Sequence, residues 1–229
     1  MRRGVARPDV DRLQAFFRER VSEVVFVTGN HDPDISETHE LLLAEGRVWV
    51  THGDVCFEDL TPWSRQRFDL RRVVRELRSR NPAADQGELG ERYRVAREAA
   101  RRVGPEIDPT DASFRAQVVR FWDTFFPPRQ VLAMVQAWRE LPAAAAALAV
   151  AQRPSAQVVV TGHVHFPGVW VRPPGPTVIN TGSFFSPLGG HLVDLLDDQV
   201  LVRRIRRRRS QFEAGRQISA IRLSQVRGR

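Results

Sequence analysis

The chain has 229 residues, enough for one domain with an inserted subdomain, and its 42% apolar content argues against a disordered chain. Its formal charge is +8, and all 35 basic residues are arginine, which points first to coding bias in a GC-rich genome and only second to a partner. The single cysteine, Cys56, excludes an internal disulfide framework. With no signal peptide and no membrane-spanning apolar run, we expect a cytoplasmic protein.

The first fifty residues alternate between helical and strand patterns. Apolar residues at Val10, Leu13, Phe16 and Phe17 have the spacing of one helix face and predict a helix over residues 9–20. The β-branched run over 24–27 predicts a buried strand. A helix over 36–45 and a strand over 47–50 are expected to follow.

The middle of the chain has a different sequence pattern. From 55 to 156 strand signals vanish, and Arg- and Glu-rich helical patterns follow one another, broken by Gly and Pro. Strands are expected again over 157–160, 169–171, 177–179, 191–195 and 200–205. We therefore predict an α/β core formed by residues 1–54 and 157–209, a helical insertion over 55–156 that caps the site, and a basic tail over 210–229 that forms at most a frayed helix.

Four predicted strands end in loops that contain glycine and polar side chains. Their sequences are Thr-Gly-Asn-His-Asp at 28–32, Thr-His-Gly-Asp at 51–54, Thr-Gly-His-Val-His at 161–165 and Asn-Thr-Gly-Ser at 180–183. Open α/β sheets bind ligands at the carboxyl ends of their strands. Imidazole nitrogens and amide oxygens are ligands for zinc, manganese, iron and cobalt. Each loop alone also fits an ordinary turn, but the series favours a metal site. His39 and His191 lie outside these loops and are expected to be structural.

This ordered set of motifs resembles the calcineurin-like metallophosphoesterase superfamily. The resemblance implies an αββα sandwich and metal-dependent hydrolysis of a phosphoester or pyrophosphate, with manganese as the first candidate metal and iron or zinc as alternatives. It also implies roles for six residues: one metal held by Asn30, His52 and His163, a neighbouring metal held by His165, a proton donated to the leaving oxygen by His31, and orientation of that acid by Asp32.

The insertion after the His-Gly-Asp loop is similar to that of the UDP-2,3-diacylglucosamine pyrophosphohydrolases, which usually carry arginine at the position of His31. A phosphorylated small molecule or a lipid-linked phosphate is therefore the implied substrate. The Asp-x-His and Gly-Asp-x-x-Asp motifs of the superfamily are absent from this sequence, so we expect an N-terminally incomplete or impaired enzyme. Three neutral ligands compensate little of a divalent charge, which predicts weak binding of metal at no more than one position.

Two other functions remain open from the sequence. The first is a non-catalytic phosphoesterase-like protein that binds a phosphorylated ligand or a partner. The second is a basic nucleic-acid-binding module built on the Arg-rich insertion and tail. The arginine run at 203–209 is suited to attract nucleic acid or an anionic membrane surface. For that run a solvated strand end is favoured, because no interleaved aromatic residues or known binding module accompany it. Oligomeric state does not follow from the sequence.

Overall fold

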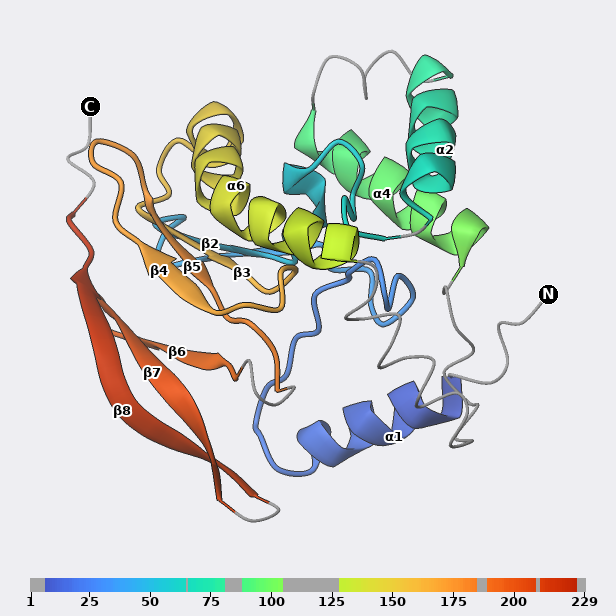
Figure 1. The fold of residues 1–229 in the computed structure, drawn as a ribbon. Coiled ribbons are helices and arrows are strands. Elements are labelled where there is room, and N and C mark those ends of the chain that lie inside the picture. Colours follow the sequence, from blue (N-terminus) through green and yellow to red (C-terminus); the bar gives the residue numbers. More distant parts are fainter. Residues whose placement is uncertain are drawn as a thin grey trace. The chain divides into compact units, whose positions relative to one another are not determined.

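The computed structural model describes residues 7–64, 66–80, 88–104, 128–184, 189–208 and 211–225 (Figure 1). The chain forms two compact units. The first comprises Met1–His39 and Asp59–Met134, and the second comprises Glu40–Glu58 and Val135–Arg229. The second unit contains every strand among the described residues, and the first contains helices and loops.

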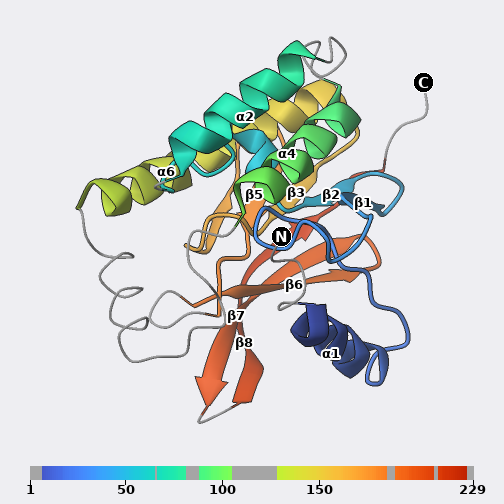
Figure 2. The same ribbon diagram turned by 90° about the vertical axis from the view of Figure 1, so that its right-hand side faces the viewer.

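The first unit holds α1 (Arg7–Arg18), α2 (Arg67–Ser79) and α4 (Leu89–Val103). The sequence predicted α1 to within two residues. Helices α2 and α4 lie side by side, and each buries apolar residues at helical spacing (Figures 1 and 2). All described elements between residues 57 and 152 are helical, as expected for the insertion. Within the described part of the chain, the helices are too short or too polar to cross a membrane.

The segment over 24–27 forms no strand, so that prediction is wrong. Its backbone pairs in no sheet, although the next residue, Thr28, donates its N–H to Thr38 O at 2.8 Å. Val25 is 44% exposed, which is incompatible with a buried strand. A run of valines becomes a strand only where a neighbouring strand offers hydrogen-bonding groups, and no strand of the described chain pairs with it.

The helix predicted over 36–45 is also wrong. Residues Glu40–Leu43 form strand β1, antiparallel to β2 (Val48–Thr51). Ala44, Glu45 and Gly46 connect them with φ values of 49°, 59° and 83°. Three successive left-handed residues reverse the chain tightly, so the leucines of β1 pair with β2 instead of winding into a helix.

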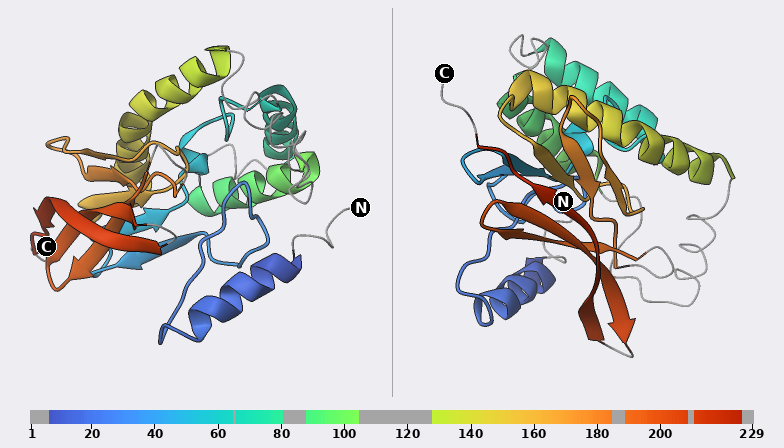
Figure 3. Two further views of the ribbon diagram at one scale, coloured as in Figure 1. Left: turned by 60° about the horizontal axis from the view of Figure 1, so that its bottom comes forward. Right: turned by 90° about the vertical axis from the view of Figure 1, so that its left-hand side faces the viewer.

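The second unit is built on a five-stranded mixed sheet with strand order β1-β2-β3-β5-β4. Strands β3 (Val158–Thr161) and β5 (Thr177–Asn180) are parallel to β2, and β4 (Gly168–Trp170) is an antiparallel edge. Every residue of β3 and β5 is buried, as in parallel strands covered on both faces. Helix α6 (Pro128–Gln152) lies along one face of this sheet (Figures 1 and 3). Trp138 of α6 packs edge-on against Trp170 of β4.

A second, antiparallel sheet faces the other side. It contains β6 (His191–Leu196), β7 (Gln199–Arg208) and β8 (Gln211–Arg222) in that order. The prediction of a frayed helix in the tail is therefore wrong. Residues 211–222 form β8, which pairs with the edge of β7 in an antiparallel ladder interrupted by a β-bulge. The described chain is thus a mixed α/β protein with a mixed sheet and a separate antiparallel sheet.

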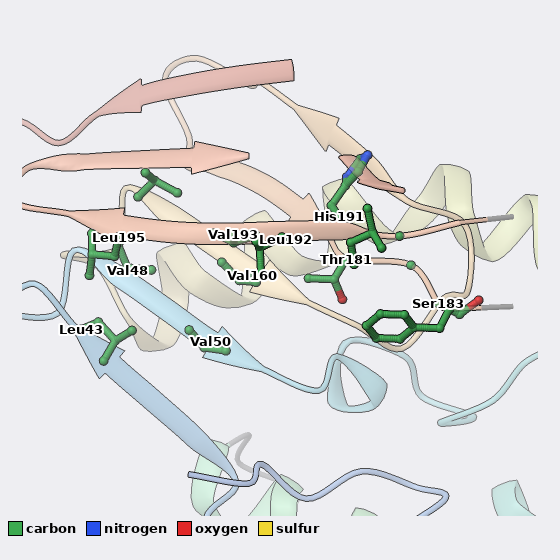
Figure 4. Close-up of a pocket in the computed structure, with 15 residues that line it drawn as sticks. Leu43, Val48, Val50, Val160, Thr181, Ser183, His191, Leu192, Val193 and Leu195 are labelled. Carbon is green, nitrogen blue, oxygen red and sulfur yellow. The ribbon is translucent and has the colours of Figure 1, made fainter. Parts of the chain in front are cut away.

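The core of the second unit lies between these two sheets. Valines of the first sheet, including Val158 and Val160, contact Val200 and Val202 of β7. The packing leaves a cavity of about 390 Å³ with mostly apolar walls from both sheets (Figure 4). His191 and the hydroxyl-bearing Thr181 and Ser183 also line it.

His191 should make the stability of the second unit pH-dependent. Its side chain is buried and its Nδ1 has no hydrogen-bond partner among the described residues. Burial, followed by the positive charge of Arg204, lowers the pKa of His191 below its ordinary value of 6.5, although a hydrogen bond to the backbone of Asn180 acts in the opposite direction.

The unfolded chain therefore binds more protons than the folded chain between the lowered pKa and 6.5. We expect the free energy of unfolding to decrease as the pH falls from 6.5 through that window. Urea unfolding at a series of pH values should give a shallower decrease for His191→Gln than for the parent chain. Equal slopes for the two proteins would contradict this assignment.

Candidate metal centre

Three of the four predicted loops lie at one edge of the five-stranded sheet. Strands β2, β3 and β5 are parallel neighbours, so their carboxyl ends lie side by side. The ladder continues into the loops, because Gly162 N donates to His52 O at 3.0 Å and Thr181 N donates to Thr161 O at 2.8 Å. The loops that carry His52, His163 and Thr181 are therefore held together through backbone hydrogen bonds.

His52 and His163 are brought into direct contact. His163 Nδ1 lies 3.1 Å from His52 Nε2, and the ring centroids are 4.9 Å apart with the rings inclined at 69°. His163 is only 2% exposed, and the Phe57 ring lies 5.9 Å from it. Two histidines separated by 111 residues thus meet at the edge where the sequence analysis expected a metal site.

Gly53 permits this approach. Its φ is +106°, in the left-handed region that side chains rarely adopt. A Cβ added there would lie 3.1 Å from Thr161 Cβ and 3.3 Å from His163 Cβ. The next residue, Asp54, is 5% exposed, and its Oδ1 accepts the N–H of Val55 at 2.9 Å, at the start of the short 3-10 helix Asp54–Cys56. Gly53 and Asp54 thus form the turn that allows the side chain of His52 to reach His163.

Asn180, the last residue of β5, holds the loop that follows β3. Its side chain is fully buried and donates from Nδ2 to Val164 O and, at 2.7 Å, to Phe166 O. Its Oδ1 accepts the hydroxyl of Thr161 at 2.9 Å. The two carbonyl groups flank His165, so one amide fixes the backbone on both sides of that residue. The sequence analysis gave Asn180 no role.

Asn30, His31 and Asp32 lie in the first unit, in a loop that α4 holds in place. Arg97 donates from Nε to Pro33 O at 2.7 Å and from Nη2 to Glu37 at 2.6 Å, and Arg101 Nε donates to Asp34 at 2.7 Å. The hydrogen bond from Arg97 lowers the pKa of Glu37, and Glu37 in turn raises the pKa of Arg97. The predicted meeting of Asn30 and His31 with the histidines of the second unit remains a prediction, as does a capping role for the insertion.

The contact between His52 and His163 is compatible with metal binding. Two nitrogen ligands about 2.1 Å from one ion lie about 3.0 Å apart at a right angle and about 3.4 Å apart at the tetrahedral angle. The observed 3.1 Å falls within that range, and it also suits a direct hydrogen bond between the rings. Among the described residues, no group of three or more His, Cys, Asp or Glu side chains is arranged to hold a metal ion. Within the described chain the geometry is thus that of a pair of imidazoles, and not of a group of three or more such side chains.

Comparisons of this chain with models of known protein families, with curated proteins and with solved structures find no match.

Replacing Gly53 with alanine should destabilise the protein by about 1–3 kcal/mol, because it adds backbone strain and crowds Thr161 and His163. Gly46→Ala is the control, since Gly46 lies in the same unit and also has a positive φ, of 83°, but its added Cβ would meet Ser155 Cβ at 3.9 Å, an ordinary van der Waals distance. Urea unfolding should show a larger loss of stability for Gly53→Ala than for Gly46→Ala. Equal losses would mean that crowding at the His163 loop contributes nothing.

Replacing Asn180 with alanine should lower the free energy of unfolding by about 2–4 kcal/mol, because the buried carbonyl group of Val164 and the partly buried one of Phe166 lose their donor. Ser183→Ala serves as the control, since Ser183 Oγ lies 3.5 Å from His165 O, a longer hydrogen bond to the same loop than those of Asn180. Hydrogen exchange should also become faster over residues 163–166 in Asn180→Ala. An unchanged exchange rate there would contradict the assignment of Asn180 as the residue that holds this loop.

Proposed function

We propose that the chain is a metal-dependent phosphoester or pyrophosphate hydrolase with the αββα architecture of the calcineurin-like metallophosphoesterases. The observation that carries this proposal is the contact of His52 with His163 at the carboxyl edge of β2 and β3. The order of the glycine-containing motifs along the chain supports it. Side-chain contact alone would fit many sites, but contact at the ligand-binding edge of a parallel sheet favours a metal-dependent reaction.

The proposed site residues divide into metal ligands and a proton donor with the residue that orients it. His52, His163 and Asn30 would provide neutral ligands to one ion, and His165 would provide a ligand to a neighbouring one. The chemistry that a divalent ion supplies when bound is activation of water and neutralisation of charge on the phosphate. His31 would donate a proton to the leaving oxygen, with Asp32 orienting its ring. Neutral ligands leave the ion's charge largely uncompensated, so manganese should bind weakly.

Metal binding and hydrolysis should depend together on His163. We expect the chain to bind no more than one manganese ion, weakly, by calorimetric titration, and His163→Ala to abolish that binding. Hydrolysis of bis-p-nitrophenyl phosphate should be near background at micromolar manganese and rise at millimolar manganese, where a weak site fills. His31→Ala should reduce turnover more than it reduces metal binding, because His31 is assigned as the acid.

His191→Gln is the matched control, since His191 lies in the same unit as His163 but outside the pair with His52. It should retain metal binding and turnover. Manganese binding that survives His163→Ala would refute the proposed centre. Two tightly bound ions with full turnover would show that other residues replace the missing carboxylates.

A further inference from the structure

Strands β7 and β8 form a hairpin with a strong excess of positive charge. It contains five arginines in β7 and two in β8, against one glutamate, Glu213. Strand β6 pairs with β7 from Gln199 to Arg204, whereas the β7–β8 ladder continues to Arg208 opposite Gln211. The distal part of the hairpin is therefore a two-stranded ribbon, seen side by side in Figures 1 and 2.

Three arginines of the hairpin gather around one hollow. Arg204 and Arg206, two residues apart on β7, share a face of the strand, and with Arg216 of β8 they line a space of about 270 Å³. A Cβ at Gly215 would lie 2.7 Å from Arg206 Cγ, so glycine leaves room for the stem of Arg206 to cross β8. Among the described residues no carboxylate forms an ion pair with these three arginines, although Glu213 lies opposite Arg206 in register.

An exposed aromatic pair lies on the other face of the hairpin, because Phe212 pairs with Arg207 whereas Arg206 pairs with Glu213. Phe212 of β8 lies opposite Arg207 in register and is 49% exposed. Its ring centroid is 4.8 Å from that of Phe184, which is 62% exposed, and the two rings meet edge to face at 75°. Two large apolar rings open to solvent provide surfaces on which planar groups can stack. Because the distal hairpin is only two strands wide, a flexible single strand that passes over its edge reaches both the arginine face and the aromatic face.

We propose that the β7–β8 hairpin binds single-stranded nucleic acid. Guanidinium groups bind phosphate oxygens in a planar, bidentate manner, and unpaired bases stack on exposed aromatic rings. Base-paired strands do not offer free base faces, so a duplex should bind less well. An anionic membrane surface would also attract the arginines. Binding to a membrane surface, however, relies on a broad apolar face, and two phenylalanines provide only a small one. The proposal is independent of the phosphoesterase activity.

The arginines are tested by fluorescence anisotropy with a labelled oligothymidylate and the full chain, in EDTA to prevent hydrolysis. The triple variant Arg204→Gln, Arg206→Gln, Arg216→Gln should bind at least about tenfold more weakly at physiological salt. The slope of log affinity against log salt should fall by about two, because each phosphate contact on a single strand contributes about 0.7. The control is a second triple variant that removes the same charge from exposed positions outside the hairpin and should bind as tightly as the parent chain. Its substitutions are Arg75→Gln, Arg139→Gln and Arg172→Gln.

Stacking is tested separately with Phe212→Ala, which should weaken binding by about tenfold. The control is Phe68→Ala, because Phe68 is 66% exposed on α2, outside the hairpin. Circular dichroism checks that each variant is folded, and if the triple variant is not, Arg206→Gln and Phe212→Ala decide the question.

Several results would overturn the proposal. Equal weakening by the two triple variants would show that net charge alone attracts the oligonucleotide. Unchanged affinity of Phe212→Ala would exclude stacking at this pair. Binding of a duplex as tightly as the single strand, or co-sedimentation with phosphatidylglycerol vesicles in the absence of oligonucleotide binding, would assign the hairpin to a different polyanion.

Discussion

The amide of Asn180 is the contact on which the candidate metal centre most depends. It ends β5, yet it binds the carbonyl groups of Val164 and Phe166 in the loop after β3 and accepts the hydroxyl of Thr161. A carboxylate could not make these contacts, because it has no N–H to donate. With its donors and its acceptor all engaged inside the protein, Asn180 rigidly joins two neighbouring strands at the edge where His163 emerges. The His52 loop then needs only the turn at Gly53 to reach it.

The buried parallel strands were predictable because their sequences leave little alternative. Val158–Thr161 and Thr177–Asn180 are short, continuous and β-branched, and both are covered on two faces. The segments that were mispredicted are those whose structure depends on a partner. Among the described residues no strand lies beside the valines over 24–27. A left-handed turn pairs the leucines of Glu40–Leu43 with β2, and residues 211–222 of the tail become a strand because β7 offers them an edge. A local pattern does not contain that information.

The same distinction applies within the site. The meeting of His52 and His163 could be predicted, since loops that follow parallel strands share an edge. The parts played by Gly53 and Asn180 could not, because each depends on which atoms lie within a few ångströms. Asn180 did carry one usable signal: a polar amide at the end of a fully buried strand needs internal partners. The loop with Asn30 and His31 belongs to the other unit, where arginines of α4 determine its local structure.

The arginines of α4 and of the β7–β8 hairpin show that the high arginine content of the chain serves more than one purpose. If arginine were only the product of coding bias, its side chains would be expected to behave alike on the surface. They do not. On α4, Arg97 and Arg101 bind carboxylates that hold a loop in place. On the β7–β8 hairpin, Arg204, Arg206 and Arg216 cluster without a carboxylate partner in the described chain, at the electrostatic cost of keeping like charges together. Coding bias accounts for arginine at all of these positions, but it does not account for the concentration of charge on the hairpin, which the binding of a polyanion, as proposed above, would explain.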